Sequence, residues 1–265
     1  ARRWIRLGGA SLQVSEFVKP TFVVTAAWLL ATQRLDPTFP GNLVSVALCA
    51  IIVGLLMLQP DFSMAVLVGT VWFAQCFLAG LHLRWVALLA AVGIAAAALA
   101  YVYVPHVTDR VDRFLDPAGG ESYQVSRALE AFYNGGWAGR GPGEGRVKEF
   151  LPDAHADFIF AVAGEEFGLV LCLIMVALFA FVVLRGFSQV LKSGDLFVLL
   201  AVTGLLVQFA VQAIINMASN INLMPPKGMT LPFVSYGGSS TLALAVGMGM
   251  VLALTRERPG GRGLR

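Results

Sequence analysis

The chain has 265 residues, of which 57% are hydrophobic and 13% charged, and its mean hydropathy is +0.75. This composition excludes a soluble globular domain, so lipid is the solvent for most of the chain. The net charge of +3 is too small and too scattered to suggest a nucleic-acid partner. The three cysteines lie inside apolar runs and have neither metal-ligand spacing nor a disulfide framework.

Long apolar runs predict an all-α integral membrane protein, a polytopic helical bundle, because about 20 apolar residues are needed to cross the hydrocarbon core. The whole chain, 1–265, is interpreted as one membrane domain with a large loop at residues 105–157. Lysine and arginine in the short loops and the tail predict that those loops are cytoplasmic and that loop 105–157 is outside. The predicted spans are 17–33, 43–59, 62–81, 85–104, 158–184, 196–217 and 237–254.

Residues 1–16 combine arginines with apolar side chains in an amphipathic pattern. An interfacial segment is the favoured interpretation, and a basic lip for an anionic head group, including Arg3, is the alternative. Glu16 and Lys19 follow three residues apart, so they share one face of the first predicted helix. Asp61, after the break at Gln59 and Pro60, is predicted to cap the third helix, and it could also face a polar cavity.

Residues 135–145 form a glycine cluster inside the predicted outer loop. Alternating glycines could let backbone N–H groups approach a phosphate, but the strand and helix of a phosphate-binding motif are missing. Flexibility is therefore the favoured interpretation of this cluster.

The most unusual stretch is 149–168, where a polar loop ends and a long apolar helix begins. Asp157 stands at the junction, two residues after His155, and a carboxylate at the mouth of a membrane helix suits a general base. The alternative is a helix N-cap. A helix N-terminus would favour the charged form of Asp157, whereas burial would oppose it. Glu165 and Glu166 are expected to face lipid, and a polar pair that holds helices together is their favoured interpretation.

The connection 218–240 carries Lys227 and a Ser-Tyr-Gly-Gly-Ser-Ser run. A cation on the outer side suits a phosphate or diphosphate group, and an interfacial anchor explains Lys227 equally well. For the run that includes Ser235 and Ser239, helix capping and close packing are favoured. Neither metal ligation nor a Ser–His–Asp arrangement is indicated.

Four segments carry the most distinctive residue combinations: RRWIRLGGASLQVSEFVK (2–19), LQPDF (58–62), LPDAHADFIFAVAGEEFG (151–168) and NINLMPPKGMTLPFVSYGGSS (220–240). In this order they resemble the SEDS family of shape, elongation, division and sporulation proteins. LPDAHADF and KGMTLP are more similar to its cell-division branch than to its elongation branch. Val14 and Ser63 depart from the family's usual proline and glycine. The resemblance implies ten membrane helices, of which the first three would precede this chain.

The resemblance also implies a peptidoglycan glycosyltransferase of the bacterial inner membrane that polymerises lipid II at the division septum. Its catalytic aspartate corresponds to Asp157, the general base for attack of an acceptor GlcNAc 4-hydroxyl on a donor MurNAc anomeric carbon. The implied partners are the growing lipid-linked glycan chain, a class B penicillin-binding protein and other membrane proteins of cell division. No cofactor or metal is predicted, and a need for a divalent cation is left open. The expected substrate-binding residues are Glu16, Lys19, Arg3, Asp61, His155, Lys227, Ser235 and Ser239.

Two other functions remain open at this point. A transporter of the lipid-linked precursor is one, because a polar cavity among helices could pass a head group. A transporter would tend to show an internal repeat and polar residues near the midplane, whereas this sequence has no repeat and gathers its polar residues on one side. A non-catalytic scaffold of the division machinery is the other, and it would tolerate Asp157→Asn.

Overall fold

The structure, a computed structural model, describes residues 4–7, 10–59, 61–81, 83–103, 107–109, 112, 122–224 and 228–256. Arg3 and Lys227, both expected to bind substrate, lie outside these residues. The chain divides into two compact units, of which the first holds Ala1–Gly80, Phe181–Phe209 and Gly238–Arg265. The second holds Leu81–Ala180 and Ala210–Gly237.

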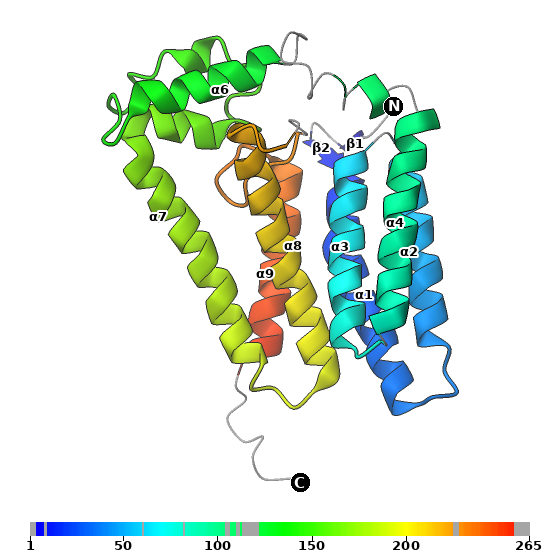
Figure 1. Cartoon of the computed structure of the whole chain (residues 1–265). Coiled ribbons are helices and arrows are strands. Elements are labelled where there is room, and N and C mark those ends of the chain that lie inside the picture. The colour runs from blue at the N-terminus through cyan, green and yellow to red at the C-terminus, as the bar shows by residue number, and fades with distance from the viewer. Residues whose placement is uncertain are drawn as a thin grey trace. The chain divides into compact units, whose positions relative to one another are not determined.

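In the first unit, helix α1 (Val14–Leu35) packs against α2 (Gly41–Leu58), α3 (Phe62–Leu78) and α9 (Gly238–Thr255) (Figure 1). Aliphatic side chains such as Val23, Val71 and Leu205 fill the space between them. Because α1, α2 and α3 are joined by short turns, they run alternately up and down, and α1 and α3 begin at the same end of this unit.

A short antiparallel hairpin precedes α1, in a segment whose sequence predicted an amphipathic interfacial stretch and no strands. Strand β1 (Trp4–Leu7) pairs with β2 (Ala10–Gln13), with Trp4 opposite Gln13 and Leu7 opposite Ala10. Trp4 and Ile5 remain exposed on this hairpin.

The second unit contains α4 (Leu83–Tyr103), α6 (Ser122–Gly135), the 3₁₀ turn η1 (Val147–Glu149) and parts of two long helices. These are α7 (Ile159–Val190), as far as residue 180, and α8 (Leu196–Asn220), from residue 210. Figure 1 shows α6 lying across the beginning of α7. Helix α6 lies inside the predicted loop 105–157, and its buried residues include Val125, Ala128 and Ala131, spaced three apart. This apolar stripe was the sequence signal for a helix there.

Five helices in the described part of the chain are long and apolar enough to cross a membrane: α1, α2, α7, α8 and α9. Helix α3, with 17 residues, is apolar but slightly shorter. The chain is therefore a mainly helical membrane protein, as its sequence predicts. The count of seven spans and their orientation stay predictions.

Candidate functional site

Asp157 lies in a turn just before α7, and two asparagines of α8 hold its backbone in place. The side-chain Nδ2 groups of Asn216 and Asn220 both donate to the Asp157 carbonyl oxygen, each at 2.9 Å. Asn220 also accepts a hydrogen bond from the Ala161 N–H at 3.1 Å, near the start of α7. The position of Asp157 is therefore fixed through its main chain, which leaves its carboxylate available for chemistry.

The carboxylate of Asp157 is partly buried, and among the described residues it accepts no hydrogen bond. Burial, together with the nearby Asp153 carboxylate, raises the pKa of Asp157 to about 6. The sequence left open whether burial or the helix N-terminus would dominate, and burial does. A pKa of about 6 is close to the value that suits a general base working near neutral pH.

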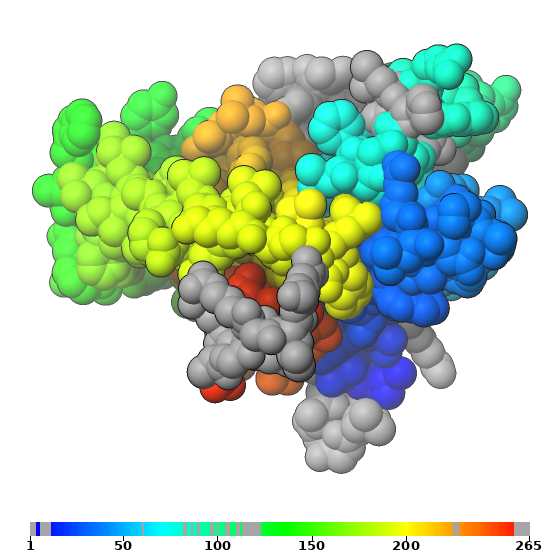
Figure 2. Space-filling view, turned by 90° about the horizontal axis from the view of Figure 1, so that it is seen from below, coloured from blue at the N-terminus to red at the C-terminus, as the bar shows by residue number. Residues whose placement is uncertain are grey.

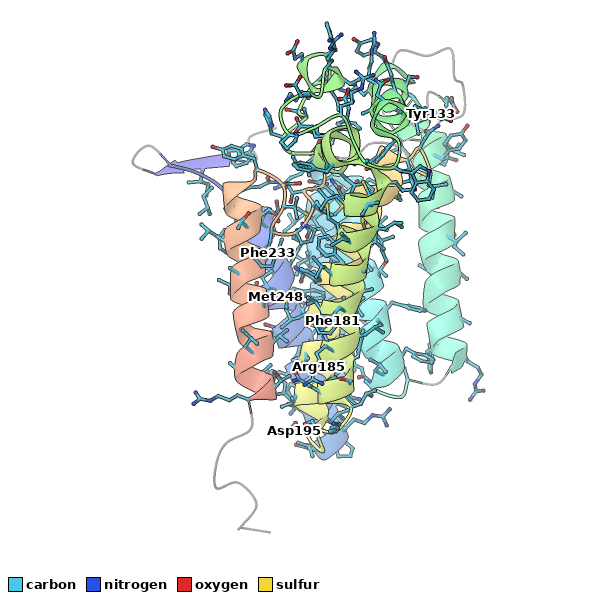
Figure 3. All side chains as sticks on the ribbon, turned by 90° about the vertical axis from the view of Figure 1, so that its left-hand side faces the viewer. Tyr133, Phe181, Arg185, Asp195, Phe233 and Met248 are labelled. Atoms are coloured by element: carbon cyan, nitrogen blue, oxygen red, sulfur yellow. The ribbon has the colours of Figure 1, made fainter. Side chains whose placement is uncertain are left out.

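A surface depression of about 450 Å³ lies beside this turn, and His155 and Ser235 both line it. The Ser235 hydroxyl donates to the Ala156 carbonyl at 2.6 Å and accepts from the Leu231 N–H at 2.7 Å. The Tyr236 N–H donates to the His155 carbonyl at 2.9 Å. The segment 228–237, which carries Phe233 in Figure 3, is therefore tied directly to the turn that precedes Asp157.

Helix α7 is broken at Gly168, and the glycine cluster of loop 105–157, the predicted outer loop and called the outer loop below, fills the break. Gly168 has φ 78° and ψ −177°, so the helical hydrogen bonds around it cannot form. Loop backbone groups replace them, donating to two carbonyls before the break and accepting from two N–H groups after it. The pairs are Arg140 to Glu165 (3.0 Å), Gly141 to Glu166 (2.9 Å), Leu169 to Gly136 (2.9 Å) and Val170 to Trp137 (3.3 Å). The expectation that this cluster is simply flexible is therefore wrong.

The side chains of Glu165 and Glu166 bind the same loop, and Glu165 does not face lipid as expected. Glu165 is fully buried and accepts hydrogen bonds from the N–H groups of Arg146 and Val147 at 3.1 Å. Glu166 pairs with Lys148 at 2.6 Å and accepts from the Gly143 N–H at 3.0 Å. A buried carboxylate needs such donors, and here they come from the outer loop, so the pair holds a loop on a helix and does not join two helices.

In the first unit, Glu16 and Lys19 share one face near the start of α1, as their spacing predicts, and they form a buried ion pair. Their side chains are 9% and 3% exposed and lie 2.7 Å apart. The Asp61 carboxylate accepts from the Met64 N–H at 3.3 Å and caps α3, also as predicted. Ser239, at the start of α9, accepts a hydrogen bond from the Gln13 N–H at 3.0 Å.

We expect Lys19→Met to destabilise the protein by about 3–5 kcal/mol, because it leaves the buried Glu16 carboxylate without its partner. The double variant Glu16→Leu/Lys19→Met should recover most of this loss, since two apolar side chains of similar volume need no charge compensation. Thermal unfolding of the two variants in the same detergent measures both effects. A double variant as unstable as Lys19→Met would contradict this account of the pair.

Sequence reasoning missed the polar stripe on α8 that organises this region. Gln208, Gln212, Asn216 and Asn220 recur at every fourth position and are all buried. Besides the bonds of Asn216 and Asn220 to Asp157, Gln212 donates to the Thr230 carbonyl at 3.1 Å. Amides spaced four residues apart in an apolar helix were the available signal, because polar groups in membrane helices need partners.

Comparisons with known proteins agree with one another. Residues 1–259 match the profile of the FtsW, RodA and SpoVE family, described as cell cycle proteins. A probable peptidoglycan glycosyltransferase FtsW of Caulobacter vibrioides is 44% identical over 99% of this chain and 67% of its own. The corresponding protein of Saccharophagus degradans is 38% identical, over 99% of this chain and 71% of its own length.

Two solved structures have similar folds. A chain from a peptidoglycan synthase complex, studied for the coordination of polymerization and crosslinking, has a TM-score of 0.75 and 29% identity over 96% of this chain and 73% of that one. The rod shape-determining protein RodA of Thermus thermophilus matches with a TM-score of 0.67 and 28% identity. The match covers 97% of this chain and 70% of the RodA chain. The match along nearly the whole sequence shows that this chain belongs to the SEDS family of FtsW and RodA.

Proposed function

We propose that the protein is a peptidoglycan glycosyltransferase that polymerises lipid II, with Asp157 as its general base. The names of the FtsW relatives support the reaction class. The observation that carries the role of Asp157 is its carboxylate, which is partly buried and accepts no hydrogen bond from the described residues. The depression is lined by His155 and Ile159, two residues before and two residues after Asp157.

The proposed reaction needs one carboxylate and a cationic environment. The acceptor GlcNAc 4-hydroxyl attacks the MurNAc anomeric carbon and passes its proton to the Asp157 carboxylate. A carbon–oxygen bond forms at the anomeric carbon as the bond to the lipid diphosphate breaks, and the diphosphate leaves with the electron pair. A hydroxyl is a weak nucleophile, so a positioned base contributes a factor of roughly 100 to 10,000. The diphosphate needs charge stabilisation and no proton.

The other predicted site residues take different roles in this proposal. His155 and Ser235 line the depression next to the turn that carries Asp157, and we propose that a sugar ring lies there. Arg3 and Lys227 are proposed to bind the diphosphate. The pairing of Lys19 with Glu16 supports a positioning role for both residues. Asp61 caps the start of α3, and Ser239 joins the start of α9 to the Gln13 N–H. We propose that both shape the substrate site indirectly.

We expect the rate to rise with pH through about 6 and to level off above it, because Asp157 accepts a proton only in its ionised form. Removing the Asp153 charge should lower the pKa of Asp157, so Asp153→Asn should move this acid limb to lower pH. Asn is a suitable replacement, since Asp153 has φ 53° and Asn tolerates the left-handed region. The measurement is kcat/KM against pH for both proteins. A profile without an acid limb would argue against Asp157 as the base.

The proposed setting is the bacterial inner membrane at the division septum, with a class B penicillin-binding protein as partner. The similarity to a chain from a peptidoglycan synthase complex and the FtsW names of the relatives support this assignment. Purified protein incubated with lipid II, with and without the partner, should form glycan chains that are resolved by gel electrophoresis. Transport of lipid II without chain formation would favour a transporter.

A further inference from the structure

A cavity of about 500 Å³ in the first unit lies where the ends of α7 and α9 meet the start of α8. Figure 2 looks onto this end, where the α7–α8 connection (yellow) lies beside the end of α9 (red). Three cations line the cavity, Arg185, Lys192 and Arg256, together with the polar side chains of Gln189, Ser193 and Thr255. None of the functions discussed above uses this cavity.

The cavity is electropositive because its cations have no acidic partner within the described part of the chain. No ion pair there involves Arg185, Lys192 or Arg256, and no carboxylate lines the cavity. Two acids lie close to these cations along the chain: Glu257, which is outside the described residues, and Asp195, which lies at the same end of the unit as Arg185 in Figure 3. The Asp195 carboxylate accepts hydrogen bonds from the N–H groups of Phe197 and Val198 and caps α8.

The rest of the lining is aliphatic. Val190 is 1% exposed and belongs to the core of the first unit, and Val198 and Leu254 pack against that core. Leu184 precedes Arg185 on α7 and Leu252 is two residues before Leu254 on α9, and they are 67% and 69% exposed, as expected of helix surfaces that face lipid. Exposed cations together with an aliphatic lining, on helices that also expose large apolar residues, fit an amphiphile better than a free anion.

We propose that this cavity binds the phosphate head group of an anionic phospholipid, with the acyl chains on the adjoining apolar helix surface. Three cations and several hydroxyl and amide groups match a phosphate diester, and a basic pocket at the membrane edge is a physical setting for such lipids. The predicted orientation assigns this end to the cytoplasmic leaflet. The proposal does not depend on the glycosyltransferase assignment.

The test is lipid binding by the purified protein, measured by native mass spectrometry during titration with phosphatidylglycerol or phosphatidylcholine. We expect one phosphatidylglycerol to bind more tightly than phosphatidylcholine. Replacing each cavity cation separately by Gln should weaken that binding by about five-fold, the effect of one basic side chain at an anionic surface. The matched control is Arg84→Gln, which removes an exposed cation outside the cavity and should leave binding unchanged.

The three single variants are tested separately, so the test stays informative even if one of them is unstable. Equal affinity for the two lipids would overturn the proposal, and so would an equal loss of binding in Arg84→Gln, since it would indicate general surface charge. Displacement of the lipid by millimolar inorganic phosphate would also overturn it, because the site would then select a free anion.

Discussion

Asp157→Asn should reduce glycan synthesis by roughly 100-fold or more, because asparagine keeps the shape of the side chain and cannot accept the proton. The variant should still fold and insert. Asn216 and Asn220 bind the Asp157 carbonyl oxygen, which every residue has, and among the described residues nothing donates to the carboxylate. The loss should therefore appear in the rate of chain formation from lipid II and not in protein yield or thermal stability.

The control for this variant is Asp153→Asn, which removes the nearby acid from the same turn. At a pH well above the pKa of Asp157, this control should synthesise glycan at nearly the wild-type rate, since Asp157 is ionised in both proteins. Near-normal synthesis by Asp157→Asn would show that Asp157 is not the general base. A transporter or a scaffold would then be the better explanation. Equal losses in the two variants would point to the fold of the turn.

Gly168→Ala should separate the outer loop from α7. The φ and ψ of Gly168 fall in a region that is essentially restricted to glycine, at a cost of about 1–3 kcal/mol for any other residue. A Cβ there would also lie 2.3 Å from the Trp137 carbonyl oxygen, and the backbone of the docked loop cannot yield as a side chain could. We expect total destabilisation of roughly 2–6 kcal/mol from strain and overpacking, with loss of glycan synthesis.

Gly143→Ala is the matched control, because Gly143 belongs to the same loop and has φ +82°, but a Cβ there meets no atom within 4 Å. It should cost only the backbone strain, about 1–2 kcal/mol. Hydrogen exchange at the Leu169 and Val170 amides reports directly on the docked loop, and it should become faster in Gly168→Ala alone. If Gly143→Ala and Gly168→Ala changed stability and hydrogen exchange equally, the close fit of the loop in the helix break would not explain the effect of Gly168→Ala.

Local patterns predicted the features that depend on a few neighbouring residues. The apolar runs predicted the long helices, the spacing of Glu16 and Lys19 predicted that they share a helix face, and the position of Asp61 predicted a cap. Each of these depends on contacts within one helix or its first turn, so a single stretch of sequence contains all the information.

Features that depend on distant segments were not predicted. Glu165 in an apolar run gives no sign that its donors are backbone groups 18 or 19 residues earlier in the chain. The glycines at 135–145 suggest freedom of the backbone, but whether that freedom serves motion or close docking depends on the partner, here the break in α7. Burial of Asp157, which sets its pKa, likewise depends on how α8 and the segment 228–237 pack around it.

The break in α7 also affects how the outer loop will respond to mutagenesis. Four of the contacts that hold the loop join main-chain atoms, so most of its side chains are not needed for docking. Trp137, for example, contributes its carbonyl oxygen while its side chain is 71% exposed. An alanine scan leaves carbonyl and N–H groups intact, so it would not detect these main-chain contacts. In this loop it would detect the glycines and Lys148, whose side chain pairs with Glu166. Backbone amide-to-ester substitution at Leu169 removes one of these donors and is the direct way to detect it.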